Sequence, residues 1–339
     1  MKRTTVHDVA EAAGVSIATV SYVMADRPLR PSGGRRYSGE TEARVKEAAH
    51  RLNYRPNPAA KAVRTGQTGV VQLSLSMLSD PWTLAVVDSV NAVAKQHGLT
   101  TTILADGDWA EALERQPTDV AFIDNVPPGH EAAGRLRRLV ESGQRLVVFD
   151  ETLEPAGFDV VRSAALPGCS LAVEHLLESH TRIGCLTAAS ARSSLVPSRF
   201  TPFVELLSAA GIEIREGWVA EFTESNESAY LAATQLLGRP DRPTAIYATT
   251  DFAALAAINA AHRLGMRVPG DVAVIGVGNT RAGERSDPTL STVGPECFYE
   301  SVAEIVVAKA LEQRPMPGVI HEFPWSLIPR ESTDAGRAA

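Results

Sequence analysis

A regular alternation of short β-rich runs with helical stretches begins at Gly69 and continues through most of the chain. Seven runs have the apolar, β-branched composition of buried strands: "VVQLSL", "TTTIL", "VAFID", "RLVVF", "IGCLT", "AIYAT" and "VAVIGV". Helical stretches lie between them, and several end in glycine, as the C-termini of helices often do. This alternation is typical of a parallel sheet covered by helices on both faces. The sequence therefore predicts an α/β fold for the larger part of the chain.

Seven strands in a chain of 339 residues exceed one comfortable sheet, so we expect two lobes with a cleft between them. Ligands of parallel α/β sheets bind outside the carboxyl ends of the strands. Side chains that follow the β-rich runs are therefore candidate ligand contacts: Trp82, Asp150, Arg199, Asp251 and Asn279. Each also has a purely structural interpretation, since Arg199 could form an ion pair and Asp251 could cap a helix.

The amino-terminal segment follows a helical period instead. Thr5 and Asp8 form the T-x-x-D start of a capping box, and apolar residues then recur at helical spacing as far as Ala13. Gly14 ends this helix and Ser16 can cap a second one, which predicts a helix-turn-helix. In that motif the second helix enters the major groove of DNA. A small helical bundle that docks on protein is the alternative.

Charge is unevenly distributed along the chain. Residues 1–67 carry twelve Lys and Arg against six Asp and Glu, a net charge of +6, although the whole chain has a formal net charge of −7. A basic head on an acidic body indicates that the head meets a polyanion. A solvated basic surface without a partner remains the alternative.

The composition argues against several classes of protein. Hydrophobic residues make up 44% and charged residues 22%, and no apolar run is long enough to span a bilayer. The first residues lack the apolar core of a secretory signal, so we expect a cytoplasmic protein with no membrane contact. Three distant cysteines and scattered histidines have no metal-ligand spacing, so we expect neither metal nor cofactor. No set of nucleophile, base and oxyanion donors is evident, so we do not expect an enzyme.

The stretches "TVHDVAEAAGVSIATVSYVM" and "YSGETEARVKEAAHRLNYRPNPAAKAVRTG" resemble the DNA-binding head of the lactose-repressor (LacI/GalR) family. The resemblance covers residues 4–66 and includes a third helix that begins at Ser38. It implies base contacts by Ile17, Ala18 and Tyr22. The other positions of the head that it assigns to DNA binding, mostly through the DNA backbone, are Thr5, Ser16, Thr19, Ser21, Tyr54 and Asn57.

Two features depart from the family pattern. The base-reading position after "TVS" is usually Arg, which suits a guanine edge, but here it is Tyr22, which cannot form the same paired contact. The loop "ADRPLRPSGGRR" is longer than the family's loop and carries four arginines: Arg27, Arg30, Arg35 and Arg36. These arginines suit additional phosphate contacts, and a solvated loop without a role is the alternative.

The segment 57–68 matches the family's hinge. It is too short to form a stable helix alone, and the resemblance implies that two such segments, one from each protomer, fold together in the minor groove. Val63 stands where the family has a leucine wedge, and Ala60 and Lys61 belong to the same groove-binding segment. A plain linker is the alternative.

Residues 68–332 resemble, more loosely, the family's effector-binding core, which is similar to sugar-binding periplasmic proteins. The landmarks are "DPW", "VVFD", "AVEHLLESHTRIGCL", "TTDFAALAAINAAHRLGMRVPGDVAVIGVGN" and "PRES". The resemblance implies an effector site between the lobes. Its residues would be Trp82, Asp150, Arg199, Phe222, Thr250, Asp251 and Asn279. Ala164, Ala165 and Gly278 replace carboxylates or amides that usually hold sugar hydroxyls, which argues against a plain hexose. A sugar-like ligand, a less polar ligand, an acidic ligand held by Arg199, and a site that no longer binds an effector are the alternatives.

The sequence thus predicts an all-α helix-turn-helix head joined to an α/β core of two periplasmic-binding-protein-like lobes with parallel sheets. We expect a head at 1–56, a hinge at 57–68, a first lobe at 69–166 with 294–323, a second lobe at 167–293 with 324–332, and a tail at 333–339. Crossings between the lobes are expected near Leu166, Val293 and Phe323.

The function that we predict is that of a homodimeric repressor. It would bind near-palindromic operator DNA, respond to a small-molecule effector and dimerise through 83–98 of the first lobe. A cytoplasmic solute-binding protein or an α/β enzyme with an accessory head is the alternative.

Overall fold

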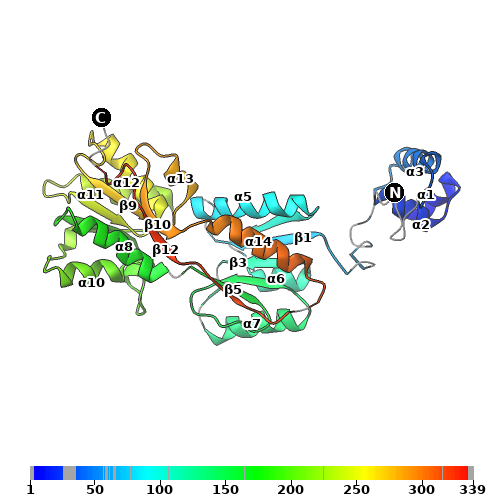
Figure 1. The fold of residues 1–339 in the computed structure, drawn as a ribbon, viewed down its shortest axis with the longest axis horizontal. Helices are drawn as coiled ribbons and strands as arrows, with labels where there is room; N and C mark the ends of the chain where they lie inside the picture. The colour runs from blue at the N-terminus through cyan, green and yellow to red at the C-terminus, as the bar shows by residue number, and fades with distance from the viewer. Residues whose placement is uncertain are drawn as a thin grey trace. The chain divides into compact units, whose positions relative to one another are not determined.

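The computed structural model describes residues 4–334, except for 26–35, 56, 58, 59, 61, 64, 65, 77, 79, 106, 125, 128, 164, 224 and 315. The chain divides into two compact units, residues 1–68, the head, and residues 69–339, the core (Figure 1). Some of the residues singled out in the sequence lie outside the description: Arg27, Arg30, Arg35, Lys61 and Ala164. Within the described ranges, no helix is long and apolar enough to span a bilayer.

The head is built from three helices: α1 (Val6–Ala13), α2 (Ile17–Met24) and α3 (Gly39–Arg51). Thr5 and Asp8 form the capping box of α1, and Gly14 ends this helix with a left-handed φ of 64°. Ser16 and Ser38 cap the two helices that follow. The buried faces of the three helices share one apolar cluster: Val9, Ala10, Ala13, Val20, Val23, Tyr37, Val45, Ala48 and Ala49. The predicted helix-turn-helix head is confirmed.

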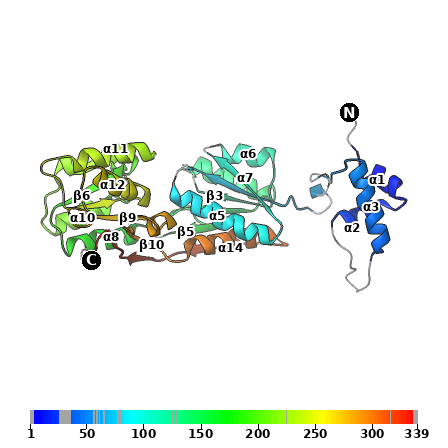
Figure 2. The same ribbon diagram turned by 90° about the horizontal axis from the view of Figure 1, so that it is seen from above.

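The first lobe of the core is a parallel sheet in the order β11-β5-β4-β3-β1-β2. Its strands are β1 (Val70–Leu75), β2 (Thr100–Ala105), β3 (Val120–Ile123), β4 (Leu146–Phe149), β5 (Asp159–Arg162) and β11 (Ile320–Glu322). Its helices are α5 (Pro81–Gln96), α6 (Trp109–Arg115), α7 (His130–Glu141) and α14 (Phe298–Leu311). Helices α5 and α14 cover one face, and α6 and α7 cover the other (Figure 2). Consecutive residues of β3 accordingly pack on opposite faces, Phe122 toward α5 and α14 and Ile123 toward α6 and α7.

The second lobe is a sheet in the order β12-β10-β9-β8-β6-β7. Its strands are β6 (Ile183–Ala188), β7 (Val219–Phe222), β8 (Ala245–Ala248), β9 (Ala273–Val277), β10 (Ser291–Pro295) and β12 (Trp325–Ile328). Helices α8 (Ala165–Leu177) and α10 (Thr201–Ala209) cover one face, and α11 (Asn226–Leu237) and α12 (Asp251–Arg263) cover the other. Short helices α9 (Ala189–Arg192) and α13 (Arg281–Glu284) follow two of the strands. The predicted parallel sheets are confirmed, and the second sheet carries one additional edge strand, β12, that runs antiparallel to β10.

The chain crosses between the lobes three times, between β5 and α8, between β10 and α14, and between β11 and β12. The predicted crossings near Leu166 and Phe323 lie close to the first and third of these. The crossing predicted near Val293 lies slightly later in the chain, because Val293 pairs with Val277 inside the second sheet and the chain leaves that sheet only after Pro295. Gly294 and Pro295 therefore belong to the second lobe, and so do Ala165 and Leu166 at the start of α8.

Candidate functional site

Helix α2 buries one face in the head and leaves the other in solvent. Val20 and Val23 are buried in the head's apolar cluster, whereas Ile17 is 45% exposed and Tyr22 is 37% exposed. The helix starts at a firm cap, because the Ser16 hydroxyl accepts a hydrogen bond of 3.1 Å from the backbone N–H of Thr19. In a helix-turn-helix, the exposed face of the second helix is the face that meets the base edges.

The other residues predicted to bind DNA lie at or near the surface of the head. Thr5 is exposed and caps α1, with its backbone N–H donating to Asp8 at 2.7 Å. Tyr54 packs at the edge of the head's apolar cluster. Solvent reaches the remaining described positions in full or in part: Ser16, Ala18, Thr19, Ser21, Asn57, Ala60 and Val63. Their contact with DNA stays a prediction.

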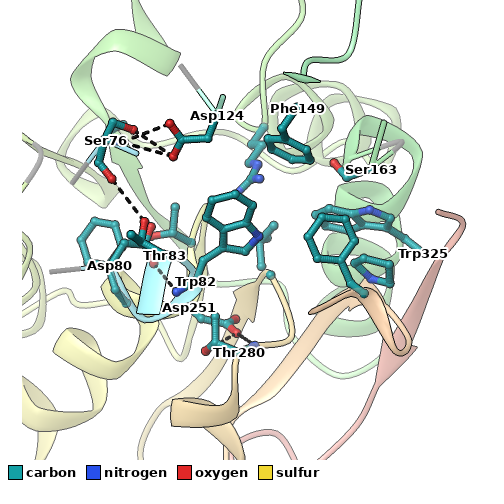
Figure 3. A pocket seen from close by; sticks show the side chains of 18 of the residues that line it. Ser76, Asp80, Trp82, Thr83, Asp124, Phe149, Ser163, Asp251, Thr280 and Trp325 are labelled. Atoms are coloured by element: carbon teal, nitrogen blue, oxygen red, sulfur yellow. Dashed lines mark hydrogen bonds between the residues drawn. The ribbon is translucent and has the colours of Figure 1, made fainter. Parts of the chain in front are cut away.

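A cavity of about 280 Å³ opens between the two lobes of the core. The first lobe contributes Ser76, Asp80, Trp82, Thr83, Asp124, Phe149 and Ser163 to its lining. The second contributes Ala188, Arg199, Phe222, Thr250, Asp251, Phe252, Val277, Gly278, Thr280, Pro295 and Trp325, and Phe298 at the start of α14 is a further contribution of the first lobe. Figure 3 shows the side chains that surround this cavity. Five of the seven residues predicted to bind an effector line it: Trp82, Arg199, Phe222, Thr250 and Asp251.

Aromatic rings form much of the cavity wall. The ring centroids of Trp82 and Phe149 lie 5.1 Å apart, and Phe298 completes the group at 6.2 Å from Trp82. Phe222 meets Phe252 edge to face in the second lobe, with centroids 5.2 Å apart. Such walls present flat apolar faces on which a ring-shaped ligand can stack.

Arg199 brings a positive charge to the cavity. Its Nη1 donates to the carbonyl oxygen of Thr249 at 3.2 Å, and its guanidinium carbon lies 5.7 Å from the ring centroid of Trp325. The Tyr247 hydroxyl donates to the carbonyl oxygen of Arg199 at 2.7 Å, which fixes the backbone from which the side chain projects. A guanidinium held in this way can bind a carboxylate or several hydroxyls of a ligand.

Asp80 is a second charged group in the lining, and it is not one of the residues predicted to bind an effector. Its Oδ1 accepts a hydrogen bond of 2.9 Å from the backbone N–H of Trp82 and so caps α5. Burial raises the pKa of the Asp80 carboxyl, while the hydrogen bond from Trp82 and the charge of Arg199 oppose this shift. The Asp-Pro-Trp sequence just after β1 is the signal that could have identified Asp80 as a helix cap at the cavity.

Asp251 is buried at the start of α12 and is bound by the protein itself. Its carboxylate accepts hydrogen bonds from Thr280 N at 2.6 Å, Thr280 Oγ1 at 2.9 Å and Thr292 Oγ1 at 2.6 Å. Figure 3 shows Asp251 beside Thr280 at the cavity wall. Burial raises the pKa of Asp251, and the bonds from the two threonines oppose this shift. Asp251 thus connects the start of α12 to Thr280, which follows β9, and to Thr292, which lies in β10.

Two residues predicted to bind an effector, Asp150 and Asn279, are not among the described residues that line the cavity. The carboxylate of Asp150 accepts from Thr152 N and Leu153 N, each at 2.7 Å, and closes a turn. Asn279 donates to the carbonyl oxygen of Pro295 at 3.3 Å and accepts from Arg330 at 3.0 Å. Both side chains therefore hold the loops that follow their strands.

Other lining residues were missed for lack of a local signal. Phe298 and Trp325 follow crossings between the lobes, far along the chain from the first cavity residues. Ser76 and Asp124 follow β1 and β3, where Ser76 N donates to the Asp124 carboxylate at 3.1 Å. In the described part of the chain, no group of three or more His, Cys, Asp or Glu residues is arranged to hold a metal ion.

Two family models match the chain. The model described as bacterial regulatory proteins of the lacI family matches residues 5–57, and the model for a periplasmic binding protein-like domain matches residues 173–333. The HTH-type transcriptional repressor PurR of Edwardsiella ictaluri is 30% identical over 299 residues, which cover 85% of this chain and 84% of the relative. PurR of Photobacterium profundum is 28% identical over 85% of this chain and 86% of its own length.

Solved structures share the fold along nearly the whole chain. A lac repressor dimer bound to operator and the anti-inducer ONPF has a TM-score of 0.72 at 23% identity and covers 98% of this chain and 100% of its own. A complex of the transcriptional regulator CelR with cellobiose has a TM-score of 0.61 at 24% identity, covering 97% of this chain and 100% of its own. These structures show the shared fold, and the relative that is 30% identical over most of both chains identifies the family. The chain belongs to the LacI family of bacterial regulatory proteins and is a DNA-binding transcriptional regulator with an effector-binding core.

Proposed function

We propose that the protein is a homodimeric transcriptional repressor that binds a near-palindromic operator and responds to a small molecule held between the lobes of its core. The observation that carries this proposal is the exposed face of the capped helix α2, which lies in the same chain as a two-lobed core with an aromatic, arginine-containing cavity. Operator DNA is in the bacterial cytoplasm, so the proposal also implies that location.

The surface of the head supports DNA binding. The head has a net charge of +6 over residues 1–67, and a positive surface attracts the phosphate backbone independently of sequence. Ile17 and Ala18, at the exposed start of α2, suit apolar contact with thymine methyl groups. The hydroxyls of Ser16 and Thr19 at the same end suit phosphate oxygens, which would fix the register of the helix in the groove.

The first lobe offers a surface for the second protomer. Strand β2 ends its sheet, so the described residues supply no strand partner for its outer edge, and Ile103 on this strand is exposed. Leu84 on the neighbouring α5 is 53% exposed. Apolar groups gathered at a sheet edge suit association with another chain. A two-fold dimer would place two heads on two half-sites related by the same symmetry, which is the reason for the near-palindrome.

The cavity supports an effector that carries a ring and polar groups. Trp82, Phe149 and Phe298 supply flat faces for stacking, and Arg199 and Asp80 supply a donor and an acceptor of hydrogen bonds. A sugar-like molecule fits this chemistry, as in the relative solved with cellobiose. An acidic ring compound fits it as well, because Arg199 would bind its carboxylate.

The coupling between effector and operator would follow from the two lobes. An effector that contacts both walls of the cavity binds one arrangement of the lobes better than another. If the same arrangement of the lobes also sets the spacing of the two heads, binding of the effector changes the affinity for the operator. Binding of the operator then changes the affinity for the effector by the same factor. A solute-binding protein or an α/β enzyme would not need the helix-turn-helix head, and neither alternative is favoured.

The experiment that tests the proposal is footprinting of the full chain on the DNA around its own gene, at rising salt and with candidate sugars and organic acids. A protected near-palindrome is expected, with affinity that falls by orders of magnitude between about 50 and 200 mM salt and changes when the effector is added. Equal affinity for this DNA and for random fragments, with and without these compounds, would overturn the proposal. Chemical conversion of a cavity ligand would instead favour an enzyme.

A further inference from the structure

Arg36 lies on the ring of Tyr22, the residue at the base-reading position of α2. The guanidinium carbon of Arg36 is 4.2 Å from the centroid of the Tyr22 ring. At this distance a guanidinium over an aromatic face gains a cation–π interaction, and its planar fork can stack on the ring. The contact joins the end of the long basic loop to the exposed face of α2.

The backbone of Arg36 is held by the two residues that follow it. Tyr37 is buried in the apolar cluster of the head, and Ser38 caps α3 by accepting a hydrogen bond of 3.2 Å from the backbone N–H of Thr41. Arg36 therefore starts from a fixed point next to the packed head, and the Tyr22 ring restrains the other end of its side chain. A side chain restrained in this way loses less conformational entropy when it binds.

The exposed start of α2 otherwise has little capacity to read guanine. Ile17 and Ala18 bear no hydrogen-bonding side-chain groups, and the Tyr22 hydroxyl offers a single group where a guanine edge presents two acceptors. Ala18 and Tyr22 are four residues apart, so they are neighbours on the surface of the helix. Arg36, stacked on Tyr22, brings a fork of N–H donors to this same surface.

We infer that Arg36 reads a guanine in each operator half-site by donating two hydrogen bonds to its O6 and N7, and that Tyr22 is the positioning residue that holds it there. This inference depends on the proposed DNA-binding function. The arginine that reads the base thus comes from the end of the loop before α3, and not from α2 itself. A contact between Arg36 and a phosphate is the competing arrangement, and it would contribute affinity without sequence preference.

The test begins with selection of preferred sites from a random duplex library by the full chain. Affinities are then measured for duplexes in which each guanine of the selected half-site is replaced in turn, either by another base or by 7-deazaguanine, which lacks the N7 acceptor. The variants are Arg36→Ala, Arg36→Lys, Tyr22→Phe and Tyr22→Leu. Arg44→Ala removes the same charge from the exposed surface of α3 and is the matched control.

One guanine is expected to depend on Arg36. The wild type should lose about ten- to hundredfold in affinity when this guanine is replaced, and Arg36→Ala should lose the same factor on the unmodified site. Arg36→Ala should then bind the 7-deaza duplex and the unmodified duplex with equal affinity, because the variant no longer contacts the N7 atom. Arg36→Lys should keep affinity for random DNA but lose the preference, because ammonium lacks the planar fork. Tyr22→Phe should keep the preference and Tyr22→Leu should reduce it.

Two results would overturn the inference while leaving the proposed function intact. A uniform loss on all sequences in Arg36→Ala, matched by Arg44→Ala, would mean that Arg36 contacts phosphate. An unchanged guanine preference in Arg36→Ala would mean that another group reads the base. If the wild type itself selects no site, the proposed function fails before the inference is reached. Circular dichroism and thermal unfolding of each variant establish that the head is folded.

Discussion

Arg281 and Glu300 join the two lobes of the core. Arg281 lies on α13 of the second lobe, and its Nη2 is 2.5 Å from Oε1 of Glu300 on α14 of the first lobe. The same nitrogen is 3.4 Å from the hydroxyl of Ser89 on α5. Both charged side chains are partly exposed, at 41% and 56%, so the pair contributes about 0–1 kcal/mol to the stability of the fold. Because this ion pair joins one lobe to the other, it favours the arrangement in which the lobes lie close together.

Arg281→Ala should leave the free energy of unfolding nearly unchanged but weaken effector binding. Without the pair, arrangements in which the lobes are apart are more populated, and an effector that needs both walls of the cavity must draw them together. The expected loss is at most about fivefold at low salt and vanishes at high salt, because the charges are screened. Calorimetry on Arg281→Ala, Glu300→Ala and the double variant measures the coupling. Independent, additive effects of the two substitutions would contradict this role.

Arg199→Ala should weaken effector binding by about ten- to hundredfold, because hydrogen bonds to a charged group contribute about 1.5–3 kcal/mol. Operator affinity without effector should stay within about twofold, since Arg199 belongs to the core cavity and not to the head. The control is Arg192→Ala, which removes an arginine of the same lobe that pairs with Glu216 and Glu221. Effector titrations followed by operator binding check both variants. Unchanged effector affinity in Arg199→Ala would assign Arg199 a structural role.

The fold could be predicted from sequence wherever a strand carries a continuous apolar, β-branched run. The seven predicted runs correspond to β1, β2, β3, β4, β6, β8 and β9. Strands β5, β7, β10, β11 and β12 were missed, because each is only three to five residues long and its apolar run is short or interrupted. Helix α14 was also missed, since it is buried along much of its length and lacks the clear polar face of a surface helix.

Of the residues that line the cavity, the sequence could predict from the sheet topology only those that follow the carboxyl end of a strand. Arg199 and Asp251 follow β6 and β8, and the rule on the carboxyl ends of parallel strands placed both correctly in the lining. The same rule selected Asp150 and Asn279, whose side chains instead bond to nearby loops. The direction of a side chain after a strand depends on loop geometry, which sequence spacing does not encode. The contact between Tyr22 and Arg36 likewise joins residues separated by an inserted loop.

Gly168→Ala should destabilise the core although it places alanine inside a helix. Gly168 lies in α8, and a Cβ at this position would overlap the Trp325 ring of β12. The overlap costs about 1–3 kcal/mol, more than the gain of up to about 1 kcal/mol in helix propensity. The control is Gly134→Ala in α7, where the nearest atom to a new Cβ is 3.8 Å away and the same change should stabilise the protein. Urea unfolding gives the sign of each change. Stabilisation by Gly168→Ala would show that Trp325 can move aside.

Asp251→Ala should cost about 2–4 kcal/mol of unfolding free energy, because three donors lose their acceptor at once. The Thr280 N–H and the hydroxyls of Thr280 and Thr292 are all directed at its carboxylate, and the site is buried. An unsatisfied buried donor costs about 1–3 kcal/mol, and a hydroxyl can turn to another acceptor whereas the backbone N–H cannot. Urea unfolding of Asp251→Ala measures this loss. Thr234→Val provides the control, since it removes a hydroxyl that donates to the carbonyl oxygen of Tyr230 within α11.

Asp251 should also make the stability of the core depend on pH in an unusual direction. Its pKa in the folded state is raised above the ordinary value of 3.8, so between the two values the folded protein holds a proton that the unfolded chain has released. The contribution of Asp251 is therefore fully present below pH 3.8 and is lost as the pH rises through the folded value. Carboxylates with lowered pKa nearer the surface, such as Asp108 and Asp271, act in the opposite direction. The useful quantity is therefore the difference in unfolding free energy between wild type and Asp251→Asn, measured from about pH 3 to pH 7. This difference should move against the wild type as the pH rises. A difference that moves in favour of the wild type would mean that the hydrogen bonds from Thr280 and Thr292 outweigh burial.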